Sequence, residues 1–162
     1  MKRVALALIV AGLASLGACM AKQEKPAPAS HRAVLDAYIA AWNRHDSLAI
    51  DTLLAKGGVH EDVPFSIRAT APEGTHAFMR DLLQSSPDYV WKVTDVVEGD
   101  NSLAAEWTWT STYTGDSPNG PVTALKISGR GASIVEIENG RIKRFSNYYD
   151  EASWLKKTDQ KD

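Results

Sequence analysis

The chain has 162 residues, a formal net charge of −2 at pH 7 and a pI near 6.1. This balance provides no basic stripe, so nucleic-acid binding has no electrostatic support. The sequence also lacks a P-loop, a GxGxxG fingerprint and a Gly-x-Ser-x-Gly elbow. Nucleotide cofactors and serine hydrolysis therefore have no sequence support, and we expect no cofactor.

Residues 1–18 have the pattern of a secretory signal peptide. Two positive charges precede an apolar run at 4–13, which is too short for the roughly 20 residues that cross a bilayer. The following stretch, 16–19, resembles the lipobox of bacterial lipoproteins, which implies that Cys19 is lipidated. The alternative is an ordinary cleaved signal with a chance cysteine.

Residues 19–29 carry charges and prolines without apolar periodicity, and we expect them to form an extended tether. Met20, not aspartate, follows Cys19, which resembles Gram-negative lipoproteins that are sent to the outer membrane. We therefore expect a lipid-anchored protein of the cell envelope, on the periplasmic face of the outer membrane. The folded domain is predicted at 30–157 and a polar tail at 158–162.

Three helices are predicted before the sheet. The first is expected to begin at Ser30 and to end by Asp46. Its apolar face contains Val34, Leu35, Tyr38, Ile39 and Trp42. A second, shorter helix is expected to begin at Asp46 or Ser47 and to close at Gly57–Gly58. Its expected inward residues are Leu48, Ile50, Leu53 and Leu54. A third helix is expected to begin near Thr75.

The apolar period changes from 3.6 to 2 after Pro87, and four strand-like segments follow. In the segment 103–114, large apolar residues alternate with glutamate and threonine, so its two faces differ chemically. Asn139–Gly140 is a strong hairpin turn signal. Helices first and an antiparallel meander afterwards predict an α+β domain, in which three N-terminal helices cover a curved antiparallel sheet and enclose a pocket.

The domain resembles the SnoaL-like branch of the NTF2-like superfamily, which includes polyketide cyclases, ketosteroid isomerases and limonene-epoxide hydrolases. This resemblance implies a cone of the cystatin-like type. The residues that carry it are the Tyr38 helix, Val59–Asp62 before Pro64, Pro87–Tyr89, Glu138–Ile142 and Asn147–Asp150.

The ketosteroid-isomerase pattern implies individual roles. Its active-site tyrosine matches Tyr38, and its aspartate base, in a stretch after the second helix, matches Asp62. The second acid of that family aligns near Ser133, a weaker donor. Polyketide cyclases carry an acid/base aspartate where Asn147 stands here.

The epoxide hydrolases need an Asp-Arg-Asp set, whose positions are occupied by Trp109, Trp107 and Asn147. Epoxide hydrolysis is therefore not expected.

His60 and Asp62 share one face of the strand that ends at Pro64. If this face lines the pocket, the pair supplies a carboxylate base and an imidazole that relays or donates a proton. The alternatives are that Asp62 is a turn or cap residue, that His60 is a polar edge residue, and that Tyr38 is a core aromatic. A zincin motif would need a histidine where Pro64 stands, so no metal site is expected.

Further residues are candidates for ligand contact. Several large aromatics are expected to suit a flat, cyclic or aromatic ligand, and His76 is expected to donate from the pocket rim. The candidate binding residues are Trp42, His76, Trp107, Trp109, Ser133, Asn147 and Tyr149.

Two functions remain open. The first is a cofactor-free isomerase, cyclase, dehydratase or lyase acting on a small hydrophobic molecule, with Asp62 as base and Tyr38 as the principal donor, helped by His60 or Asn147. The second is a lipid-anchored binding or assembly module without chemistry. We also expect a homodimer, because a sheet face that carries several tryptophans needs cover.

Overall fold

The structure is a computed structural model that describes residues 30–117, 120–150 and 152. The expected signal peptide, Cys19, the tether and the polar tail lie outside these residues. No helix of the described part is long and apolar enough to cross a membrane.

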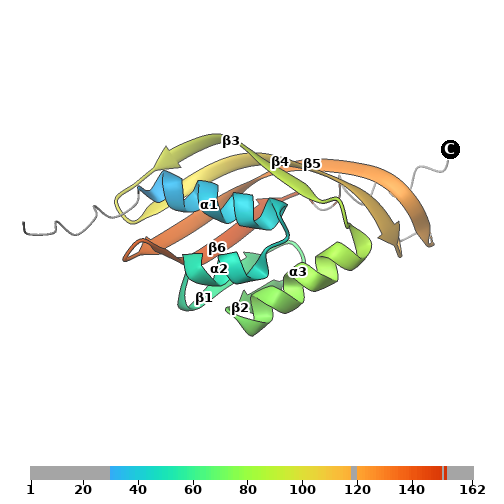
Figure 1. The fold of residues 1–162 in the computed structure, drawn as a ribbon. Helices are drawn as coiled ribbons and strands as arrows, with labels where there is room; N and C mark the ends of the chain where they lie inside the picture. The colour runs from blue at the N-terminus through green and yellow to red at the C-terminus, as the bar shows by residue number, and fades with distance from the viewer. Residues whose placement is uncertain (1–29, 118–119, 151, 153–162) are drawn as a thin grey trace, which may run out of the picture.

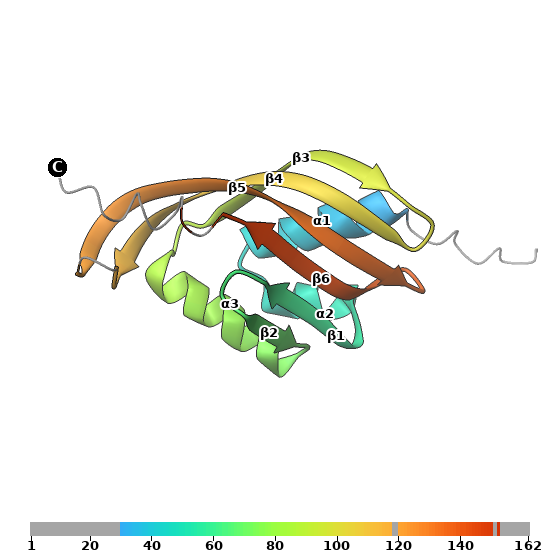
Figure 2. The same cartoon turned by 180° about the vertical axis from the view of Figure 1, so that it is seen from behind.

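Three helices lie under one strongly arched six-stranded sheet (Figures 1 and 2). The elements are α1 (His31–Asn43), α2 (Ser47–Leu53), β1 (Leu54–Asp62), β2 (Ile67–Thr70), α3 (Glu73–Ser85), β3 (Val90–Glu98), β4 (Ser102–Gly115), β5 (Val122–Glu138) and β6 (Arg141–Tyr149). The strand order is β2-β1-β6-β5-β4-β3. The predicted α+β architecture is confirmed. The sheet is not wholly antiparallel, however, because β1 pairs with β6 in parallel.

Local signals position the first two helices as predicted. The Ser30 hydroxyl accepts a hydrogen bond from the backbone of α1, and the Asp46 carboxylate does the same for α2. At the end of α1, the Asn43 amide makes two hydrogen bonds of 2.8 Å with the backbone of Trp91. The Asn43 amide thus pairs with the backbone N–H and C=O of Trp91 as an adjacent strand would. These bonds fix α1 against β3, an edge strand of the sheet.

The predicted end of the second helix is wrong. Helix α2 ends at Leu53, and Gly57–Gly58 lie within β1. Gly57 has a φ of +70°, and a Cβ on Gly58 would lie 2.8 Å from the carbonyl oxygen of Ile142. The glycines therefore serve an irregularity in β1, where its register with β6 shifts. Leu48, expected to face inward, is 72% exposed.

The period-2 pattern of β4 is confirmed. Trp107 and Trp109 are buried on the concave face, opposite Gly131 and Gly129 of β5. The Trp109 indole would be 2.6 Å from a Cβ on Gly129. The two glycines thus leave room for indole rings to lie flat on the strand. Because Trp91 is buried as well, the face that carries the tryptophans is already covered within one chain, and the homodimer stays a prediction.

We predict that Gly131→Ala destabilises the fold by about 1–3 kcal/mol, because overpacking forces a close-packed core to shift. A Cβ at Gly131 would meet the Trp107 ring and would lie 2.6 Å from the Tyr148 carbonyl oxygen. Urea denaturation measures the change. Gly99→Ala is the control, because its Cβ would meet only atoms at 3.5 Å. Equal stability of the two variants would contradict this packing argument.

Candidate active site

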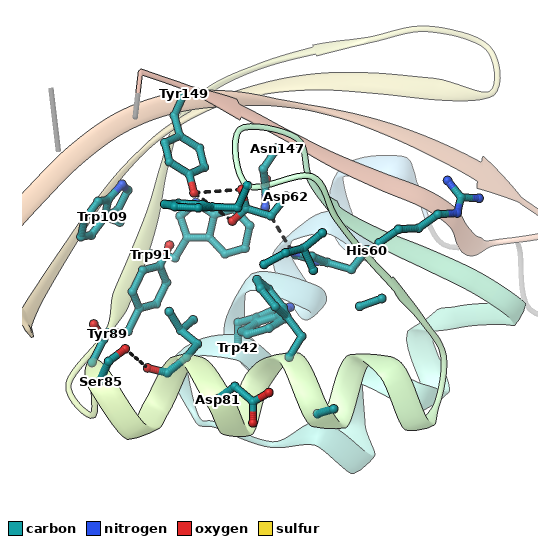
Figure 3. Close-up of a pocket in the computed structure, with 18 of the residues that line it drawn as sticks. Trp42, His60, Asp62, Asp81, Ser85, Tyr89, Trp91, Trp109, Asn147 and Tyr149 are labelled. Atoms are coloured by element: carbon teal, nitrogen blue, oxygen red, sulfur yellow. Dashed lines mark hydrogen bonds between the residues drawn. The ribbon is translucent and has the colours of Figure 1, made fainter. Parts of the chain in front are cut away.

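A cavity of about 610 Å³ opens between the concave face of the sheet and α3 (Figure 3). Its walls come from α1, α3, all six strands and the β1–β2 and α3–β3 connections. Aromatic side chains make most of these walls: Trp42, Phe65, Phe78, Tyr89, Trp91, Trp107, Trp109, Tyr113 and Tyr149. Such an apolar concavity with a few polar groups is typical of a small-molecule site.

One carboxylate lies at the sheet side of this cavity. Asp62, at the end of β1, is 8% exposed, and the Tyr149 hydroxyl lies 2.9 Å from both of its oxygens. Asp62 aligns with Asn147 across the parallel pair β1–β6, and Asn147 aligns with Ser133 across β5–β6. The three residues therefore form one polar row across three strands, with neighbouring strands about 4.8 Å apart.

His60 lies two residues before Asp62 on the same face of β1. Its Nδ1 is 2.8 Å from the Tyr38 hydroxyl, and its Nε2 is 3.2 Å from the Asn147 amide nitrogen. On the far side of Asn147, the Ser133 hydroxyl donates to the amide oxygen at 2.6 Å, and the Trp107 indole donates to Ser133 at 2.7 Å. Five of the sequence-predicted residues are thus joined in one hydrogen-bonded chain, whereas Asp62 is bound separately by Tyr149.

The His60 ring is enclosed by other rings. It stacks on Phe145 with an interplanar angle of 2° and contacts Trp42 and Phe78 at centroid distances of 5.2 and 5.0 Å. Burial disfavours the charged imidazolium and lowers the pKa of His60 to about 3, although the Glu61 charge opposes the shift. His60 is therefore neutral at physiological pH, and a resting imidazolium is not available as a proton donor.

The structure brings most candidate binding residues to the cavity. Asp62, His60, Trp42, Trp107, Trp109, Asn147 and Tyr149 all line it. Three candidates lie elsewhere. The Tyr38 hydroxyl contacts His60 behind the wall, and burial raises the Tyr38 pKa well above its usual value. Ser133 lies beneath Asn147, and His76 binds Asp51 at 2.9 Å, which joins α3 to α2.

Sequence reasoning missed Tyr89 and Trp91 as cavity residues. Both line the same cavity as Asp62. Burial, and next the negative charge of Asp62, raise the pKa of Tyr89, so its hydroxyl stays protonated. The period-2 pattern of β3 places Trp91 on the inward face, and this pattern could have identified it as a cavity residue. No group of three metal-ligating side chains occurs among the described residues.

An arched sheet over three helices, with an aromatic cavity that Asp62 reaches from the sheet, defines an NTF2-like α+β protein. The family model described as SnoaL-like polyketide cyclase matches residues 32–158. The chain therefore belongs to the SnoaL-like polyketide cyclase family. Among proteins of curated function, none has a significantly matching sequence.

Solved structures support the same fold. A protein from Pseudomonas putida that is classed with the polyketide cyclases is 25% identical, with a TM-score of 0.61 over 76% of this chain and 94% of its own. A SnoaL-like protein from Shewanella putrefaciens is 11% identical, with a TM-score of 0.72 over 80% and 96%. A protein with a ketosteroid isomerase-like fold from Catenulispora acidiphila, in complex with trimethylamine, is 17% identical, with a TM-score of 0.68 over 79% and 93%.

We predict that the buried, neutral His60 makes the fold sensitive to acid. Its folded pKa of about 3 lies below the ordinary value of 6.5, so the unfolded state binds the extra proton between these two values. Stability is therefore lost as the pH falls below 6.5, by about 2 kcal/mol at pH 5.

The measurement is the free energy of unfolding of wild type and His60→Gln at pH 7.5 and pH 5. The variant should show a smaller loss than wild type. Carboxylates elsewhere titrate equally in both proteins, so the difference isolates the histidine. If the variant does not fold, NMR titration of His60 in wild type gives the same answer, and a midpoint near pH 6.5 would contradict the prediction.

Proposed function

We propose that the protein is a cofactor-free acid/base enzyme for a small, planar, hydrophobic molecule, with Asp62 as general base. The observation that carries this proposal is the single inward carboxylate of the sheet row, beside the Asn147 amide, in a cavity walled by aromatic rings. Membership of the SnoaL-like polyketide cyclase family supports it.

The reaction begins with transfer of a proton from a carbon next to a carbonyl group to Asp62. The C–H electron pair then forms a C=C bond, and the carbonyl electron pair moves onto oxygen, which becomes an oxyanion. Return of the proton at another carbon gives an isomer. Alternatively, the enolate carbon attacks a second carbonyl of the same molecule and closes a ring, and the alkoxide formed at that carbonyl takes the proton from Asp62. Neither outcome needs an oxidant or a reductant.

The walls favour a flat and uncharged ligand. Tyr89 stacks with Trp109 at a centroid distance of 5.7 Å, and Trp91 stands perpendicular to Trp107 at 5.4 Å. These faces bury a planar ring system and exclude water, which strengthens the electrostatic interactions inside the cavity. A second negative charge beside Asp62 would be repelled, so a neutral ketone suits the cavity better than a carboxylate.

Tyr38 and His60 take supporting roles in this proposal. The Tyr38 hydroxyl reaches the ligand only through His60, so the expected direct donation by Tyr38 is replaced by a positioning role. His60 faces the cavity with an edge that is already engaged by Asn147.

A binding module without chemistry is the second candidate function. The same cavity would hold the ligand, and the replacement of a family aspartate by Asn147 favours this alternative. The enzyme accelerates proton removal from carbon, whereas the binding module does not, and this difference distinguishes the two functions.

We predict that wild type accelerates exchange of the α-hydrogens of 1-tetralone, a planar ketone, for deuterium in D₂O. Proton NMR measures the exchange whether or not product forms. Asp62→Asn should lower the accelerated rate by about 10²- to 10⁴-fold, because a positioned general base contributes about this factor.

Glu61→Gln is the matched control for this measurement. It removes a carboxylate from the same strand, and Glu61 contacts Ser146, Arg144 and Arg68 but does not itself line the cavity. Thermal unfolding of both variants reports whether they fold. Full activity of Asp62→Asn, or no acceleration by wild type with 1-tetralone and its three-ring analogues, would refute the base assignment.

We also propose that the domain is held at the periplasmic face of the outer membrane by an acylated Cys19. The lipobox-like stretch at 16–19 supports this proposal. Cys19→Ala should move the protein from the membrane fraction to the soluble fraction, or stall its processing. Mass spectrometry of the mature protein is the check, and an unmodified peptide that spans Ala18 and Cys19 would contradict the anchor.

A further inference from the structure

The chain of hydrogen bonds behind the cavity wall runs in one direction. An indole N–H is only a donor, so Trp107 must donate to the Ser133 oxygen. Ser133 then uses its own hydrogen to donate to the amide oxygen of Asn147. The amide nitrogen, which is also only a donor, therefore faces Nε2 of His60 at 3.2 Å.

The same argument determines the tautomer of His60. Its Nε2 accepts from Asn147, so the hydrogen of the neutral ring must be on Nδ1. Nδ1 then donates to the Tyr38 oxygen at 2.8 Å. Four of these five side chains are at most 2% exposed, and Asn147 is 6% exposed. Water therefore does not compete for these bonds, and the Trp107 donor occupies one lone pair of Ser133, whose hydrogen is donated to the Asn147 oxygen.

This arrangement leaves the second hydrogen of the Asn147 amide available to a ligand. One N–H points to His60, and within the described part of the chain the other is left for the cavity that Asn147 lines. Asp62 occupies the adjacent position of the neighbouring strand. A ligand carbonyl oxygen can thus contact the amide while its α-carbon faces the carboxylate.

We propose that Asn147 is the catalytic oxyanion donor, and that Trp107, Ser133, His60 and Tyr38 are positioning residues that prevent its amide from flipping. The inference rests on the proposed function. A flipped amide would present its oxygen to the developing oxyanion and repel it. An unrestrained asparagine adopts both orientations, whereas here Ser133 donates to the amide oxygen and Nε2 of His60 faces the amide nitrogen.

This arrangement assigns a role to a residue that cannot itself move a proton. The family's aspartate at this position exchanges protons with the ligand, but an amide only donates a hydrogen bond. Acid and base work is therefore concentrated on Asp62, which must remove the proton and return it. Stabilisation of the oxyanion by this one hydrogen bond is expected to raise the rate by about 10²- to 10³-fold, as for a single oxyanion donor.

The first test is the tautomer of His60, measured by ¹⁵N NMR on the full folded domain without ligand. The expected spectrum of wild type has a protonated, pyrrole-type Nδ1 and a bare, pyridine-type Nε2. Asn147→Asp places an oxygen against Nε2, so the hydrogen should move to Nε2 or the ring should become charged. A protonated Nε2 in the neutral wild-type ring would overturn the proposal, because Asn147 would then present its oxygen to His60.

The second test uses 2-naphthol, whose phenolic oxygen imitates the oxyanion, and naphthalene, which lacks it. Wild type should bind 2-naphthol more tightly, and Asn147→Ala should lose at least tenfold of that preference while its affinity for naphthalene changes little. Ser133→Ala should lose a smaller part and should give a mixture of His60 tautomers. Ser111→Ala is the control, because it removes a buried β4 hydroxyl that binds Asp88.

The outcomes separate this inference from the proposed enzyme function. Preference for 2-naphthol that depends on Asn147, without deuterium exchange in 1-tetralone, supports the donor in a binding protein and refutes catalysis. Exchange that depends on Asp62 but not on Asn147 refutes the donor and leaves the base assignment intact. Equal affinity of wild type for the two probes, or a Ser133→Ala variant with an unchanged tautomer and preference, also overturns the proposal.

Discussion

The site depends on one constraint, which is that polar atoms buried under an aromatic cavity must be hydrogen-bonded. An unpaired buried donor or acceptor costs about 1–3 kcal/mol. The concave face of the sheet carries His60, Ser133 and Asn147, all buried among large rings. They satisfy one another and extend to Trp107 and Tyr38, so these five side chains form one connected network, whereas the buried indole nitrogens of Trp42 and Trp91 have no hydrogen-bond partner within the described part of the chain. The hydrogen bonds that satisfy the buried atoms of this network therefore also orient the Asn147 and His60 side chains toward the cavity.

Much of the fold follows from local sequence. Ser30 and Asp46 cap helices through their own neighbours, the alternation in β4 sorts its two faces, and Asn139–Gly140 forms the expected turn with positive φ at both residues. These features involve contacts within a few residues, so the sequence contains the needed information. The end of α2 was predicted wrongly because Gly57–Gly58 is an equally good signal for a helix end and for an irregular strand. The carbonyl of Ile142, 84 positions from Gly58, decides between the two.

The site was predictable only in part for the same reason. His60 and Asp62 lie two residues apart on one strand, so their shared face could be read directly. The row Asp62–Asn147–Ser133 requires the parallel register of β1 with β6, which no local pattern specifies. Tyr38 was placed on the correct helix face, but a helical pattern cannot distinguish a side chain in the core from one that reaches through to a cavity. The structure places His60 between Tyr38 and the ligand space.

The charge pattern of the cavity limits the chemistry that it supports. Tyr38 and Tyr89 stay protonated because burial raises their pKa values, and His60 stays neutral because burial lowers its pKa. The residues next to Asp62, Tyr149 and Asn147, are therefore neutral dipoles, and the one cation of the described lining, Arg68, is paired with Glu61. A buried cation beside the base would hold the carboxylate ionised but would also weaken it as a proton acceptor. Neutral donors avoid this conflict, because a dipole fixed by packing stabilises the oxyanion when it forms and attracts the resting carboxylate less strongly than a full charge would. In the proposed mechanism an amide held by its neighbours takes this role, where a carboxyl group would first have to be kept protonated.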